Sequence, residues 1–181
     1  FSAGMHMMQG ILLALLQREK TGRGQQVSVS LYDTMLAAQT QEGTSHMMRG
    51  REVNWGAMPL SGVFPTSDGA VVLVGAFKSH PLRDISAALE IDDLSADPRF
   101  RDHPAQVANK AALHQIFRAR FATYTTERAL ARLEGQDLLC APVRTLAEAL
   151  ADPQTAVNGM VMEAEGAFET VRVVGSPIHM S

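Results

Sequence analysis

The stretch Lys20-Thr21-Gly22-Arg23-Gly24-Gln25-Gln26-Val27-Ser28-Val29-Ser30-Leu31 separates two helical patterns in the first third of the chain. Residues 2–20 have helical length and composition, and the glycines that follow are typical of a helix C-terminus. Residues 26–31 alternate polar and apolar side chains, which is the period of a strand. A second helix is predicted from Tyr32 or Asp33 to about residue 46. Helix, tight turn, strand and helix together indicate an α/β layer.

The first helix carries apolar residues at three- and four-residue steps, as a helix face turned toward a core would. We expect this face to consist of Met5, Met8, Leu12, Leu15 and Leu16. Ser2 and Asp33 are the residue types that cap helix N-termini, so each is predicted to be an N-cap.

The rest of the chain divides at residues 50–62, which hold three glycines, Pro59 and the only tryptophan and read as a long loop or linker. After it we expect a β-hairpin around Ser67-Asp68-Gly69, then helices, a short buried strand and a second hairpin. The predicted ranges are strands 63–64 and 71–74, helices 81–89, 105–124 and 126–135, strand 138–143, helix 146–150, and strands 160–165 and 168–174. The predicted fold class is α/β with three parts: a helix–strand–helix piece of a larger domain with its linker (1–55), a small α+β domain (56–160), and returning strands (161–181).

Composition excludes several classes of protein. The chain has 181 residues, 46% of them hydrophobic, and 16 basic residues against 19 acidic ones, a balance that argues against a dedicated nucleic-acid binder. No apolar run approaches the ~18 residues needed to span a bilayer, so we expect no membrane segment. The single cysteine, Cys140, fits a soluble, cytoplasmic protein and is expected to be a buried apolar side chain.

Motifs for common catalytic or cofactor sites are absent from the sequence. Gly22-Arg23-Gly24 lacks the third glycine of a dinucleotide-binding loop, and no Gly-x-Ser-x-Gly elbow occurs. The six histidines have no metal-ligand spacing, so no metal site is predicted. The local spacing of these residues therefore indicates no catalytic site.

A series of short motifs, in order, resembles the family III CoA-transferases, the CaiB/BaiF family. This family includes formyl-CoA and carnitine CoA-transferases and the α-methylacyl-CoA racemases. The matching segments are Gly4-Met5-His6, Lys20-Thr21-Gly22-Arg23-Gly24-Gln25, Val27-Ser28-Val29-Ser30-Leu31-Tyr32-Asp33, Phe64-Pro65-Thr66-Ser67-Asp68-Gly69, Asp97-Pro98-Arg99-Phe100, Ala141-Pro142-Val143, Asp152-Pro153-Gln154 and Val174-Gly175-Ser176-Pro177. Each also has a plain structural interpretation, such as a helix stop at 20–25 or a cap by Asp97 on the helix after it.

The resemblance implies a Rossmann-like large domain, a small domain and two interlocked ring-like chains forming a homodimer. It implies an aspartate nucleophile directly before Phe1, so that the catalytic residue is not in this chain and the 181 residues are part of a longer protein. Gly4 would let a thioester approach closely, and His6, one turn below, would contact substrate or pack.

The family's glycine-rich loop should correspond to the segment between Arg49 and Gly56, which has no run of consecutive glycines. This departure argues against an oxalate-type enzyme. By resemblance, Asn54, Trp55 and Gly56 would line the acyl pocket; the alternative is that they only pack in the linker.

The resemblance implies that CoA moves between an acyl-CoA thioester and a carboxylic acid through an aspartyl-CoA intermediate, with no permanently bound cofactor and no nucleic-acid or membrane partner. A racemase on the same scaffold is the first alternative. Racemases carry a glutamate shortly after the segment matched by Val74-Gly75-Ala76-Phe77, where this chain has Lys78, which cannot serve as a carboxylate base. The second alternative is an inactive interaction module.

Overall fold

A computed structural model of the chain describes residues 1–51, 53–75, 77–166 and 168–180. The fold is α/β, and its contacts divide the chain into a first unit, Phe1–Trp55, and a second unit, Gly56–Ser181. The division into parts 1–55, 56–160 and 161–181 stays a prediction. None of the helices in the described ranges is both long and apolar enough to cross a membrane.

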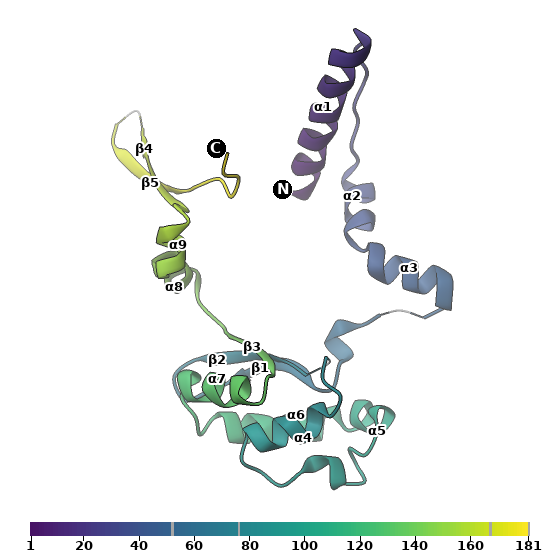
Figure 1. Cartoon of the computed structure of the whole chain (residues 1–181), viewed down its shortest axis with the longest axis vertical. Coiled ribbons are helices and arrows are strands. Elements are labelled where there is room, and N and C mark those ends of the chain that lie inside the picture. The colour runs from purple at the N-terminus through teal and green to yellow at the C-terminus, as the bar shows by residue number, and fades with distance from the viewer. Residues whose placement is uncertain (52, 76, 167, 181) are drawn as a thin grey trace. The chain divides into compact units, whose positions relative to one another are not determined.

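The first unit contains three helices, α1 (Ser2–Thr21), α2 (Leu31–Ala38) and α3 (Thr40–Arg49) (Figure 1). Helix α1 ends as predicted, because Gly22 takes the left-handed conformation (φ 69°) and donates its N–H to the Arg18 carbonyl at 2.8 Å. The predicted strand at 26–31 is wrong. Residues 23–30 have no strand partner within the described chain, and Leu31 already belongs to α2.

Both predicted N-caps of the first unit are also wrong. Phe1 occupies the N-cap position of α1, and Ser2 is its first helical residue. Ser30 caps α2, because its Oγ accepts the Asp33 backbone N–H at 3.2 Å. Ser30 lies three residues ahead of Asp33 and has the extended backbone that an N-cap residue adopts (φ −95°, ψ 142°), so Ser30 rather than Asp33 is the cap. The single helix predicted to residue 46 divides at Gln39, whose N–H bonds the Leu36 carbonyl.

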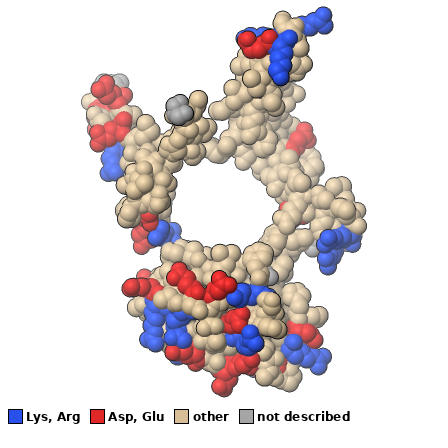
Figure 2. Space-filling model, viewed as in Figure 1, with Lys and Arg blue, Asp and Glu red and all other residues tan. Residues whose placement is uncertain are grey.

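The face of α1 that packs within the chain is not the predicted one. Ala3, Met7, Gly10 and Ala14 are half-buried, whereas Met5, Met8, Leu12, Leu15 and Leu16 are 41–62% exposed. Gly10 explains the choice of face, since a Cβ there would lie 2.6 Å from Val27 Cγ1. The extended segment therefore packs against the small residues of α1. Figure 2 shows the larger apolar surface of α1 as uncharged, with Lys, Arg and Glu side chains gathered at one end of the helix.

The second unit is built on a three-stranded antiparallel sheet in the order β1-β2-β3, with β1 (Ser61–Pro65), β2 (Ala70–Val74) and β3 (Leu139–Pro142). The hairpin and β3 were predicted. The pairs Phe64↔Val71 and Leu73↔Cys140 place the buried side chains on one face. The helices lie beneath that face in Figure 1. They are α4 (Pro81–Ala88), α5 (His103–Ala108), α6 (Lys110–Phe121) and α7 (Thr126–Gly135), with short 3-10 turns η1 (Trp55–Ala57) and η2 (Leu94–Ala96).

Phe64 is the central side chain of this core. It is fully buried, stacks on Phe121 at a centroid distance of 5.1 Å, and meets the edges of His114 and Phe117 at 5.1 and 5.7 Å. Aromatic pairs in this geometry contribute about 0.5–1.5 kcal/mol beyond area burial. The contacts fix α6 against β1. The remaining core is Leu60, Val71, Leu73, Leu82, Ile85, Ala88, Leu89, Phe100, Leu113, Tyr124, Ala129, Leu133 and Leu138.

Two of the motifs quoted above, those that contain Asp68 and Asp97, have structural roles in this unit. Asp68 in the hairpin turn accepts the Thr126 backbone N–H at 2.7 Å and its hydroxyl at 2.8 Å, which holds the turn to the start of α7 and lowers the pKa of Asp68. The prediction that Asp97 caps the helix after it is wrong. It accepts the Arg99 N–H at 2.9 Å, and Asp102 caps α5 by accepting the Ala105 N–H at 2.9 Å. The long helix predicted at 105–124 divides at Asn109.

The chain ends in two short helices and a second hairpin. These are α8 (Leu146–Ala151), α9 (Pro153–Val157), β4 (Val161–Glu165) and β5 (Thr170–Val174). Helix α9 was not predicted, because Asp152-Pro153 resembles a helix stop. Here Asp152 is the N-cap and Pro153 the first helical residue. The joining turn includes Ala167, which lies outside the described residues.

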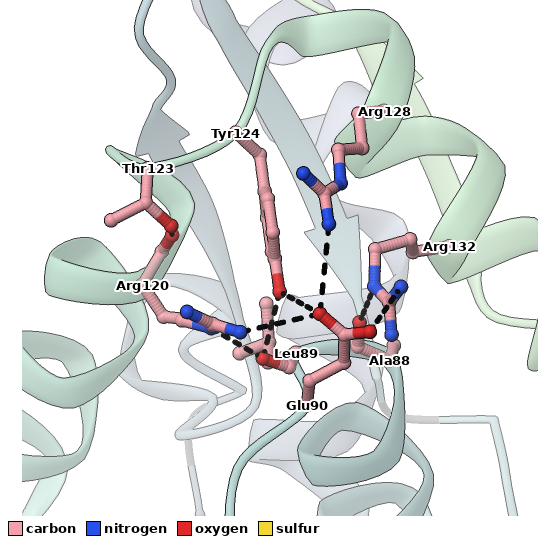
Figure 3. Close-up of polar contacts among 8 residues, drawn as sticks. All are labelled: Ala88, Leu89, Glu90, Arg120, Thr123, Tyr124, Arg128 and Arg132. Atoms are coloured by element: carbon pink, nitrogen blue, oxygen red, sulfur yellow. Dashed lines mark hydrogen bonds and ion pairs between the residues drawn. The ribbon is translucent and has the colours of Figure 1, made fainter.

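Glu90 closes the C-terminal end of α4 (Figure 3). Its carboxylate accepts the Tyr124 hydroxyl at 3.1 Å and pairs with Arg132 at 2.9 Å, Arg120 at 3.3 Å and Arg128 at 3.8 Å. Arg120 also donates Nε–H to the Leu89 carbonyl at 2.6 Å, and Arg132 donates to the Ala88 carbonyl. The arginines thus satisfy carbonyls that the helix end leaves without partners, and the cluster joins α4 to α6 and α7.

The Glu90 cluster yields a stability prediction. The hydrogen bond from Tyr124, followed by the charges of Arg132, Arg128 and Arg120, lowers the pKa of Glu90. A lowered pKa stabilises the fold above the ordinary glutamate pKa, and this contribution is lost as the pH falls through the folded-state value. Glu90→Gln should therefore lower Tm at pH 7, and the difference from wild type should shrink in acid. Glu134→Gln, which removes the same charge from an exposed position on α7, is the control; equal Tm changes for both would contradict this role.

Gly10 yields a second prediction. Alanine is about 1 kcal/mol better than glycine inside a helix, so propensity alone favours Gly10→Ala. The 2.6 Å approach to Val27 Cγ1 predicts the opposite, because the branched valine side chain is stiff. We expect Gly10→Ala to lower the free energy of unfolding in urea. Gly43→Ala, in α3 with no atom within 4 Å of the new Cβ, should be neutral or stabilising. Stabilisation by both changes would show that Val27 does not pack closely on α1.

Candidate functional site

Gly4 and His6 lie at the start of α1. The N-cap residue, Phe1, has no side-chain acceptor for the first backbone N–H groups, and the first turn contains no acidic residue. A Cβ on Gly4 would meet nothing within 4 Å, so this side of the helix is open. His6 is exposed, and its Nδ1 lies 2.9 Å from the Ser2 carbonyl, which as an acceptor requires Nδ1–H. In the neutral ring Nε2 is then left as an acceptor. The N-terminal end of α1 can therefore receive an anionic or polar group.

Asn54, Trp55 and Gly56 follow α3 and form the start of the linker, which we define as residues 54–60. All three are exposed, Trp55 at 48%. The Trp55 Nε1–H donates to Glu42 Oε1 on α3 at 2.9 Å. This bond uses the edge of the indole and leaves part of the ring surface accessible. Trp55 is thus held by one polar contact rather than by burial.

The other end of the linker is attached to α6. Lys110 Nζ donates to the Gly56 carbonyl, and His114 Nε2 lies 2.9 Å from the Pro59 carbonyl. The Leu60 carbonyl accepts the Gly75 N–H at 3.0 Å. Pro59 and Leu60 are buried. Because Lys110 and His114 are four residues apart, they lie on one face of α6 and reach two carbonyls of the same segment.

His114 is a buried histidine between the linker and the aromatic core. Its Cε1 would lie 3.1 Å from a Cβ on Gly62, so only glycine fits at that position of β1 without displacement. Burial lowers the pKa of His114, partly opposed by the hydrogen bond with Pro59, and the charges of Lys110 and Arg118 lower it further. A neutral ring with Nε2–H satisfies the Pro59 carbonyl.

The structure joins only some of the predicted site residues. Asn54, Trp55 and Gly56 are consecutive, and Gly4 and His6 share the start of α1; no hydrogen bond links the two groups in the described part of the chain. Sequence reasoning did not identify Glu42, Lys110 or His114. The i, i+4 spacing of Lys110 and His114 is visible in the sequence, but their partners lie 54 and 55 residues away.

A groove of about 670 Å³ runs beside α3 and reaches Val53, the residue before Asn54. Thr40 and Ser45, which line it, already donate their hydroxyls to the backbone carbonyls of Ala37 and Arg51. Arg49, also in the lining, is a basic residue of the type that pairs with carboxylates. The full lining is Ala38, Thr40, Gln41, Thr44, Ser45, Met48, Arg49 and Val53.

Two further groups are not placed for catalysis. Cys140 is half-buried, and burial together with Glu134 raises the pKa of its thiol, so the thiolate is disfavoured. Lys78 Nζ lies 3.1 Å from Asp137 and 4.0 Å from Asp84. Ala76, in the segment compared with the racemases, lies outside the described residues. Across residues 1–51, 53–75, 77–166 and 168–180, no three His, Cys, Asp or Glu side chains gather as a metal site would require.

Several known proteins are similar to this chain in sequence or in fold. The model of CoA-transferase family III matches residues 1–181, and the chain belongs to that family. A mouse succinyl-CoA:glutarate CoA-transferase is 29% identical over 167 residues, which cover 90% of this chain and 38% of the mouse protein. A succinyl-CoA:mesaconate CoA-transferase of Haloarcula hispanica is 31% identical over 188 residues, covering 95% and 44% of the two chains.

Among solved structures, a CaiB/BaiF family protein from Brucella suis superposes with a TM-score of 0.79 at 26% identity, covering 100% of this chain and 48% of that one. The chain thus spans about half the length of this solved relative and about two-fifths of the mouse and Haloarcula proteins. The resemblance inferred from the motifs, and the fold class, are confirmed.

The contact between Trp55 and Glu42 can be tested directly. Glu42→Ala removes the acceptor, so Trp55 should become more accessible, with red-shifted emission and stronger acrylamide quenching. Glu42→Gln replaces the carboxylate by an amide whose oxygen can still accept the bond from Trp55, so this variant should behave nearly as wild type. Difference spectra against Trp55→Phe isolate this residue's emission. Gln41→Ala, next to Glu42, is the matched control; an equal change in this variant would show that the bond does not hold the indole.

Proposed function

We propose that the protein of which these residues form a part is a CoA-transferase that moves CoA from an acyl-CoA thioester to a carboxylic acid. The observation that carries the proposal is the match of the whole chain to the family model, together with relatives named as CoA-transferases.

The proposed mechanism uses an aspartate directly before Phe1. Its carboxylate attacks the thioester carbonyl, forming a mixed anhydride and releasing CoA thiolate. The thiolate then attacks the aspartyl carbonyl, which gives an aspartyl-CoA thioester and frees the donor acid. The acceptor carboxylate attacks this thioester, releasing CoA thiolate and forming a second mixed anhydride with the aspartate. The thiolate then attacks the acceptor carbonyl of this anhydride, which forms the new acyl-CoA and frees the aspartate.

The described residues support this chemistry in two places. The start of α1 has first-turn N–H groups without a side-chain cap and no acidic side chain, which favours negative charge on the preceding carboxylate. The open space at Gly4 allows a thioester to approach, and His6 is exposed one turn further on. We assign Asn54, Trp55 and Gly56 to the wall of the acyl site, beside the groove that Arg49 lines.

The acids named in the relatives narrow the substrates to be tried first. Glutarate and mesaconate are dicarboxylic acids, and both relatives use succinyl-CoA as donor by name. We propose a short dicarboxylic acid as acceptor, with Arg49 placed to meet its second carboxylate.

The remaining features of the proposal come from the family. They are a homodimer of interlocked chains, a cytoplasmic location, and coenzyme A acting only as part of the substrate. A racemase reaction on the same fold is the competing hypothesis, and the isolated 181 residues are expected to be inactive without the aspartate.

The test uses the full-length protein with succinyl-CoA, glutarate and hydroxylamine. The transferase should form glutaryl-CoA, and hydroxylamine should trap a hydroxamate at the aspartate before Phe1, located by peptide mass spectrometry. Its Asp→Asn variant should form neither product. Exchange of an α-proton of a branched acyl-CoA with deuterated solvent, without CoA transfer, would establish the racemase instead. Transfer of CoA without a trapped hydroxamate would overturn the covalent mechanism.

A further inference from the structure

The linker is held by two different units of the chain through contacts of different kinds. Trp55 bonds Glu42 in the first unit, whereas the Gly56 and Pro59 carbonyls bond Lys110 and His114 on α6 of the second unit. Lys110 and His114 thus hold two carbonyls within the four residues 56–59.

The His114 contact is rigid. The ring is 7% exposed, its centroid lies 5.1 Å from that of Phe64, and its Cε1 would lie only 3.1 Å from a Cβ at Gly62. The Pro59 carbonyl therefore has a fixed position relative to the core. Leu60, also buried, is fixed by the Gly75 N–H.

The Lys110 contact extends this rigidity to the exposed end of the linker. Gly56 is exposed, and Lys110 Nζ reaches its carbonyl from the start of α6. Gly56 directly follows Trp55 in the sequence, so Lys110 holds the backbone next to that residue.

We propose that Lys110 and His114 are positioning residues that set the place of Asn54, Trp55 and Gly56 against the acyl part of the substrate. The inference rests on the proposed function, since it takes these three residues as part of the acyl site. Lys110 acts on the exposed end and His114 on the buried end. Neither side chain needs to touch the substrate.

Kinetics of the full-length enzyme separate positioning from a merely structural role. Lys110→Met keeps the aliphatic stem of this half-buried side chain and removes only the donor, so Tm should change little. A displaced binding segment weakens substrate and transition state alike, so KM for acyl-CoA should rise about tenfold with kcat nearly unchanged. Lys110→Arg, which restores a donor, should recover most of the loss. Arg118→Met removes the same charge from an exposed position on α6 and should leave KM unchanged.

The same logic applies to His114. His114→Gln places an amide N–H near the position of Nε2, whereas His114→Phe keeps a ring and loses the donor. KM should rise more in His114→Phe than in His114→Gln when both are assayed well below their Tm values. Unchanged KM in Lys110→Met and His114→Phe, with only Tm lowered, would show that the contacts are structural and overturn the proposal.

A readout independent of activity distinguishes this proposal from the proposed function. Lys110→Met should alter the emission and acrylamide quenching of Trp55, measured as a difference against Trp55→Phe. If the wild-type enzyme transfers no CoA but the Trp55 signal changes, the proposed function fails and the positioning of the linker stands. If CoA transfer is normal and neither KM nor Trp55 emission responds, only the positioning is wrong.

Discussion

The stacking of Phe64 against Phe121, with Phe117 and His114 at its edges, is the interaction on which the second unit depends. It places α6 at a fixed height and rotation below β1. Replacing a fully buried phenylalanine by alanine typically costs about 3–5 kcal/mol, comparable to the whole stability of many domains. The same rotation of α6 that buries Phe117 and Phe121 turns Lys110 and His114 toward the linker. The packing of the core therefore also determines where Lys110 and His114 hold the linker.

Elements with strong local signals could be predicted from the sequence. The hairpin has its turn residues at Ser67-Asp68-Gly69, helix α4 starts with Pro81, and helix α7 is capped by the Thr125 side chain. The breaks at Gln39 and Asn109 could not be predicted, because each depends on side-chain bonds to backbone carbonyls that compete with a continuous helix. The strand expected at 26–31 has the right alternation, but a strand also requires a hydrogen-bonding neighbour.

The candidate site was predictable only in part for the same reason. Gly4 and His6 followed from a motif that resembles the family, and residues 54–56 from the position expected for the family's glycine-rich loop. The assignment of all of them to substrate stays a prediction. The hydrogen bonds that hold the linker join residues 13, 54 and 55 positions apart in the sequence. Lys110 and His114 also look like ordinary members of an amphipathic helix, since a half-buried lysine and a buried histidine on one face both suit α6. Only the fold shows that they meet carbonyls of one segment.

The two ends of the linker differ in how firmly they are held. The bond from Trp55 to Glu42 is exposed, so water competes for both groups and its net contribution is small. The bond from His114 to Pro59 is buried, and losing it would leave a carbonyl without a partner in a dry environment, which costs about 1–3 kcal/mol. Thermal motion should therefore release the indole before it releases the Pro59 end. The Pro59 end of the linker is therefore held more firmly than the indole of Trp55.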